Sequence, residues 1–169
     1  MNADGTFCLG FKADNFVVAP PNAKAWWIKL SVFLTCQETA FESRGWPPNI
    51  EVSHGRAGEI EVKAELVAEG LGALEAYQLA VREDSGPIAM AVRRIRKSTG
   101  QLINGRAVCV CGRKHKRGWI RLRRQCWRAN DPCLPLMEAQ RRLEEQRFWK
   151  ALKGKQQCCG TMDDCPLNA

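Results

Sequence analysis

The sequence predicts an α+β fold: an N-terminal module of mixed strands and helices, then a basic zinc-finger-like segment, then a C-terminal helix. Three observations predict it, namely an aromatic and β-branched run near the N-terminus, a basic cysteine-rich middle and a regular helical pattern near the C-terminus. We therefore expect an acidic α+β module over residues 1–86, a basic Cys/His finger over 87–130, and a helix with a cysteine-containing tail over 131–169.

The composition is that of an ordinary folded protein. Of the 169 residues, 45% are hydrophobic and 26% are charged, which excludes a disordered or collagen-like chain. No apolar run approaches the roughly 18 residues of a membrane-spanning helix, and the N-terminus lacks the pattern of a secretory signal. We expect no association with a membrane.

The first module begins with the run AWWIKLSVFLTCQETA at residues 25–40. Because it is rich in aromatic and β-branched residues, we expect a buried strand. The prolines in RGWPPN, residues 44–49, cannot continue a strand ladder, so this stretch predicts a turn. A second short strand is expected at residues 50–52.

The rest of this module has a mixed pattern. Residues 59–67 fit both an alternating strand and a helical stripe, and the period alone does not decide between them. Residues 69–82 fit a helix better, with glycines at its start. The sequence Asp-Ser-Gly-Pro at residues 84–87 predicts a break and the boundary of the module. We expect residues 1–86 to bind a protein partner of the host.

The charge is divided sharply along the chain. Residues 1–86 hold 7 basic and 12 acidic residues, whereas residues 87–169 hold 19 basic and 6 acidic ones. Residues 91–128 contain 13 Lys and Arg and no acidic residue. Such a segment repels itself, and a polyanion offsets that repulsion most directly. The pattern therefore predicts a nucleic-acid surface, although a solvated basic face or a nuclear import signal in RRIRK fits part of it.

Four potential ligands in the basic segment follow one another in an order that suits a zinc site. They are Cys109, Cys111, His115 and Cys126, and Cys133 competes with Cys126 for the fourth place. Zinc takes four thiolate or imidazole ligands in a tetrahedron, and the neighbouring arginines favour the thiolate form. The usual first pair is C-x2-C, whereas here it is C-x-C. Among nine cysteines in all, those at the C-terminus are expected to lie in a loose tail.

The basic residues alternate with tryptophans whose faces can stack unpaired bases. Phosphates would be neutralised by the lysines and arginines. The candidate RNA-binding residues are Arg93, Arg94, Arg96, Lys97, Arg113, Lys114, Lys116, Arg117, Trp119, Arg121, Arg123, Arg124 and Arg128.

The clearest helix in the sequence covers residues 135–152. Proline suits its first turn, Glu138 and Arg142 form a pair four residues apart, and we expect the helix to stop at Gly154. We expect this helix to pack on the first module, with self-association as the alternative.

The basic residues at 93–97, followed by Cys109, Cys111, His115 and Cys126, resemble small cysteine-rich proteins of plant positive-strand RNA viruses. These are the basic zinc-finger nucleic-acid-binding proteins of vitiviruses, carlaviruses and closteroviruses. The resemblance covers residues 91–128, under a quarter of the chain. It implies RNA binding, suppression of host RNA silencing, and a location in host cytoplasm and nucleus.

We therefore expect an RNA-binding protein that contains zinc and is not an enzyme. Whether the RNA is single- or double-stranded stays open. One alternative is a zinc-containing regulator that binds DNA, although Gly112 and Gly118 interrupt any recognition helix in this segment. Another is a viral cysteine protease that pairs Cys36 with His54 or His115, but TCQET resembles no nucleophile signature.

Overall fold

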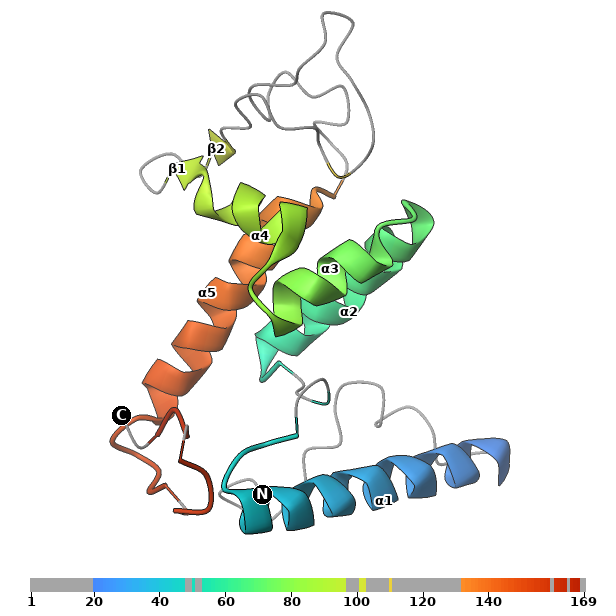
Figure 1. Ribbon diagram of the computed structural model, residues 1–169, viewed down its shortest axis with the longest axis vertical. Coiled ribbons are helices and arrows are strands. Elements are labelled where there is room, and N and C mark those ends of the chain that lie inside the picture. Colours follow the sequence, from blue (N-terminus) through green and yellow to red (C-terminus); the bar gives the residue numbers. More distant parts are fainter. Residues whose placement is uncertain are drawn as a thin grey trace, which may run out of the picture. The chain divides into compact units, whose positions relative to one another are not determined.

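The computed structural model is mostly helical (Figure 1), so the predicted α+β fold is wrong. The structure describes residues 20–47, 50, 53–96, 101–102, 110, 132–158, 160–163 and 165–167. Chain contacts divide the protein into two compact units. The first consists of residues 1–54 and 146–169, and the second of residues 55–145.

In the first unit, helix α1 covers Pro20–Ser43, where the sequence predicts a strand over residues 25–40. Cys36 and Ala40 of this stretch are buried four positions apart, and the half-buried residues Trp26, Lys29, Leu30, Phe33 and Gln37 also recur every three or four positions. This spacing is the period of a helix. The stretch is therefore helical, although its β-branched and aromatic composition favours a strand. The strand expected at residues 50–52 lies largely outside the described residues.

The C-terminal segment joins the end of α1 in this first unit. Arg44 Nε donates a hydrogen bond of 2.7 Å to Asp163 Oδ1, and the backbone amide of Asp163 donates one of 2.9 Å to the carbonyl of Arg44. Cys165 is buried in the same unit. Asp163 is therefore held by specific contacts and Cys165 is buried, so the prediction of a loose tail does not hold for these two residues.

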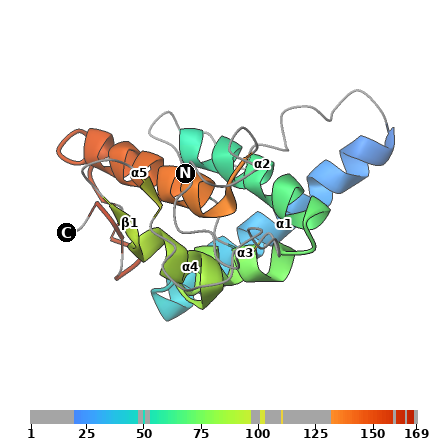
Figure 2. The same ribbon diagram turned by 90° about the horizontal axis from the view of Figure 1, so that it is seen from above.

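The second unit begins with two helices that lie side by side (Figure 2). Helix α2 covers Arg56–Gly70 and helix α3 covers Leu74–Arg82. The ambiguous residues 59–67 are helical, because Ile60, Ala64 and Ala68 of α2 are buried at the helical period. The helix expected over residues 69–82 is interrupted before α3 by a turn that contains Gly72 at φ +63°.

The remaining elements of this unit flank the basic segment. Helix α4 covers Gly86–Arg93 and packs on α3. Strands β1 (Ile95–Arg96) and β2 (Gln101–Leu102) pair antiparallel, with Ile95 opposite Leu102. Helix α5 covers Leu134–Leu152, which confirms the predicted helix over residues 135–152.

A small core holds the second unit together. Its larger members are Tyr77, Ile88 and Leu134, which are at most 2% exposed. Alanines of α2, α3 and α4 fill the space between them, and such small side chains allow the helices to approach closely. Leu134 brings the start of α5 into this core, which agrees with the expected packing role of that helix. None of the helices in the described part is long and apolar enough to cross a membrane.

Candidate nucleic-acid interface

The basic segment lies between two anchored helices. It follows α4, whose Ile88 and Ala89 belong to the core, and it precedes α5, whose Leu134 also belongs to the core. Three of its candidate RNA-binding residues are described, namely Arg93, Arg94 and Arg96. The others lie outside the described residues: Lys97, Arg113, Lys114, Lys116, Arg117, Trp119, Arg121, Arg123, Arg124 and Arg128.

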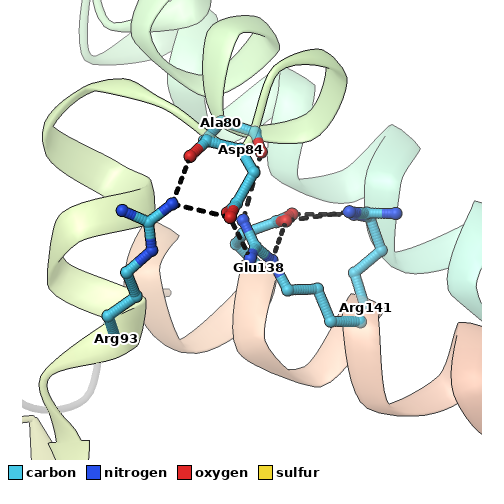
Figure 3. A network of polar contacts seen from close by, with 6 residues as sticks. Ala80, Asp84, Arg93, Glu138 and Arg141 are labelled. Carbon is cyan, nitrogen blue, oxygen red and sulfur yellow. Dashed lines mark hydrogen bonds and ion pairs between the residues drawn. The ribbon is translucent and has the colours of Figure 1, made fainter.

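Arg93 forms an ion pair within the second unit (Figure 3). Its Nη2 donates hydrogen bonds of 2.6 Å to both the carboxylate and the backbone carbonyl of Asp84. Asp84 lies in the turn between α3 and α4, so the contact fixes the end of α4 against this turn. The charge of Arg93 is already balanced there, which makes this residue a weaker candidate for RNA than its neighbours.

The same carboxylate connects to α5. Arg142 Nη1 donates a hydrogen bond of 2.5 Å to Asp84 Oδ1, and Nη2 donates one of 3.1 Å to the carbonyl of Ala80. Asp84 therefore contacts an arginine on each of the two helices that flank the basic segment. The hydrogen bonds from Arg93 and then Arg142 lower the pKa of Asp84 below its ordinary value, so the carboxyl stays ionised at neutral pH.

Glu138 lies at the buried centre of this network, as Figure 3 shows. Its carboxylate accepts hydrogen bonds of 2.7 and 2.8 Å from Arg141 and one of 2.7 Å from Arg142. Glu138 has no exposed surface, and the Arg141 side chain is 10% exposed. A buried charge requires such pairing, because an unpaired one is costly to remove from water.

Tyr77 of α3 is buried close to this charged centre. Burial and then the charge of Glu138 raise the pKa of Tyr77 far above its ordinary value, so the phenol stays protonated. Its hydroxyl has no hydrogen-bond partner among the described residues. The sequence gives no sign of this arrangement, although it does indicate the pairing of Glu138 with Arg142 through their spacing.

Arg94 and Arg96 differ from Arg93 in their surroundings. Both are exposed, and neither forms an ion pair with an acidic residue in the described part of the chain. They lie on either side of Ile95, at the start of the short β1–β2 pairing. Their charges are available to an anion that approaches this end of α4.

The four candidate zinc ligands, Cys109, Cys111, His115 and Cys126, lie outside the described residues. Val110, between the first two, is described, and it packs against the core of the second unit. The competing ligand Cys133 lies just before α5, where its carbonyl accepts hydrogen bonds from the amides of Leu136 and Met137. Within the described ranges, no group of three or more potential ligands is arranged for a metal.

The histidine and cysteine considered for a protease both lie in the first unit. Cys36 is 3% exposed on the buried face of α1. The ring of His54 stacks on Phe148 at 5.2 Å and meets the edge of Trp149 at 4.6 Å. These surroundings favour structural roles for both residues.

Comparison with protein families finds two matches. Residues 53–167 match a family described as a cysteine-rich domain, C-terminal to E2 domain. Residues 1–48 match a family described as a prokaryotic E2 domain. No curated protein and no solved structure matches the chain.

These matches overturn the resemblance to plant viral proteins. The two matches, over residues 1–48 and 53–167, cover far more of the chain than the viral pattern over residues 91–128. The predictions of a viral protein, of silencing suppression and of a location in host cytoplasm and nucleus are therefore wrong. The order of the Cys and His residues did not identify the family, because a short pattern of metal-ligating residues arises in unrelated proteins.

Proposed function

The chain belongs to the family of cysteine-rich domains that lie C-terminal to an E2 domain, and we propose that its basic segment binds RNA through the phosphates. The observation that carries this proposal is the run of 13 Lys and Arg without any acidic residue over residues 91–128. Phosphate contacts of this kind depend strongly on salt and weakly on base sequence.

The ion pairs of Asp84 and Glu138 support the proposal, because they involve the two helices that flank the basic segment. Asp84 pairs with Arg93 of α4 and with Arg142 of α5, and Glu138 pairs with Arg141 and Arg142 within α5. Arg94 and Arg96 remain exposed at the end of α4. These two arginines are therefore open to an anion at this end of α4.

Zinc is the second part of the proposal. Three thiolates and one imidazole, from Cys109, Cys111, Cys126 and His115, make a donor set that suits a structural zinc ion. The ion would hold distant parts of the segment together. Val110, which lies between Cys109 and Cys111 in the sequence, packs on the core of the second unit. Cys133, just before α5, stays the alternative to Cys126 as the fourth ligand.

RNA is preferred to DNA because glycines interrupt any recognition helix in the basic segment. Gly112 and Gly118 disfavour the continuous helix that reads the major groove of DNA. Single-stranded RNA instead offers phosphates together with unpaired bases, which Trp119 and Trp127 can stack.

The exposed pair of arginines provides a test by substitution. Arg94→Ala/Arg96→Ala should weaken binding of the reduced, zinc-loaded protein to two unrelated single-stranded RNAs by similar factors. The slope of log K against log salt should become shallower by about 0.7 for each lost phosphate contact. Fluorescence anisotropy with labelled RNA measures both quantities.

Two substitutions in the acidic half provide the matched control. Arg56→Ala/Arg82→Ala removes the same charge from α2 and α3 and should change RNA affinity much less. Equal losses for both double variants would contradict a local site. A loss that depends on RNA sequence would contradict binding through phosphates.

A further inference from the structure

Helix α1 has an exposed apolar face on the side opposite its buried one. Cys36 and Ala40 are at most 3% exposed, whereas Trp27, Leu34 and Phe41 are 63%, 47% and 75% exposed. Trp27, Leu34 and Phe41 follow one another at intervals of seven, which places them along one line of the helix, whereas the exposed Ile28 and Val32 lie off this line. Isolated exposed apolar residues are common, but an aligned series of large ones is typical of an interface.

The spacing within this face is that of a helix pair. Leu30 and Gln37, which are half-buried, lie between the exposed residues and complete the alternation of three and four residues, from Trp27 to Phe41. This alternation lets two helices interlock side chains along a seam. A polar residue such as Gln37 within a seam helps to fix how the helices align.

Charges beside the seam indicate which partner fits. Lys24 is exposed near the start of α1, and Glu38 and Glu42 are exposed near its end. When a second copy of α1 runs antiparallel with Leu30 opposite Leu34, Lys24 of each copy lies between Glu38 and Glu42 of the other. A two-fold axis then repeats this attraction at both ends of the seam. A parallel pair would instead bring identical charges into register.

We propose that the chain forms an antiparallel homodimer through the Trp27–Leu34–Phe41 face of α1. This inference is independent of RNA binding, because the face lies in the segment that matches the E2 domain and far in sequence from residues 91–128. A seam of one helix from each copy buries a small area, so the dimer is weak and reversible.

Sedimentation equilibrium of the full chain under reducing conditions tests the dimer. The mass should rise from the 19.0 kDa of one chain toward twice that value as the concentration increases. Leu34→Glu should leave a monomer that still binds RNA as the unchanged protein does. Leu66→Glu, at an exposed leucine of α2, should leave the dimer intact, and circular dichroism confirms that both variants fold.

Charge reversal tests the antiparallel arrangement. Lys24→Glu should weaken the dimer about fivefold or more, and the triple variant Lys24→Glu/Glu38→Lys/Glu42→Lys should restore it. A chain that stays monomeric at all concentrations, or a dimer that Leu34→Glu leaves intact, would overturn the proposal. Loss of the dimer in Leu34→Glu without any effect of Lys24→Glu would overturn the antiparallel alignment.

Discussion

Glu138 shows how much of this protein depends on one buried carboxylate. It has no exposed surface, and it holds Arg141 and Arg142 on the same helix. The sequence indicates the Glu138–Arg142 pair by its spacing, which is typical of a solvated helix surface. Burial of the pair depends on how α5 packs against α3 and α4, and a single helix pattern does not contain that information.

Glu138→Gln should lower the free energy of unfolding by about 3 kcal/mol, because it leaves the nearly buried Arg141 without its counter-charge. The matched control is Glu75→Gln, at an exposed position of α3, which should change stability by no more than about 0.5 kcal/mol. Urea denaturation followed by circular dichroism measures both. Similar small changes in the two variants would show that the Glu138 network contributes little.

At the scale of elements, the turn between α3 and α4 sets the start of the basic half. Asp84 and Gly86 both have positive φ, at 47° and 78°. The sequence Asp-Ser-Gly-Pro predicted this break, since these residues tolerate such conformations. It did not predict that Asp84 would also contact Arg93 and Arg142, because that role requires the neighbouring helices to be in place.

Gly86→Ala should destabilise the protein by about 1–2 kcal/mol, the cost of a left-handed conformation for a residue with a side chain. A Cβ there would also lie 2.9 Å from Leu79 Cδ2. Gly70→Ala, at the end of α2, meets no neighbouring atom within 4 Å and should be neutral or stabilising. Thermal unfolding of the two variants makes the comparison, and equal melting temperatures would refute the argument.

Helices α1 and α5 show where sequence patterns succeed and fail. The pattern of α5 predicted its type and nearly its bounds, because caps and charged pairs agreed with the helical period. In α1 the β-branched and aromatic residues favoured a strand, and only the low exposure of Phe33, Cys36 and Ala40 shows the helical period. The strand propensity of these residues predicted the wrong element for α1, because packing outweighs propensity there.

At the scale of the whole molecule, the division of the chain by charge differs from its division into compact units. Charge changes sign near residue 86, whereas the compact units change near residues 54 and 145. The first unit joins both ends of the chain, as the contact of Arg44 with Asp163 illustrates. A contact over 119 residues leaves no local trace in the sequence. Self-association through residues 135–152 stays a prediction, as does a protein partner for residues 1–86.

The central claim is that the basic segment binds RNA through phosphates and that zinc stabilises it. The most direct measurement is the RNA affinity of the reduced protein across a range of salt concentrations, with and without a zinc chelator. The account predicts that log K falls linearly with log salt, at about 0.7 for each contacted phosphate of a single strand, and that the chelator weakens binding. No binding at low salt would contradict the claim and would assign the arginines to a protein partner.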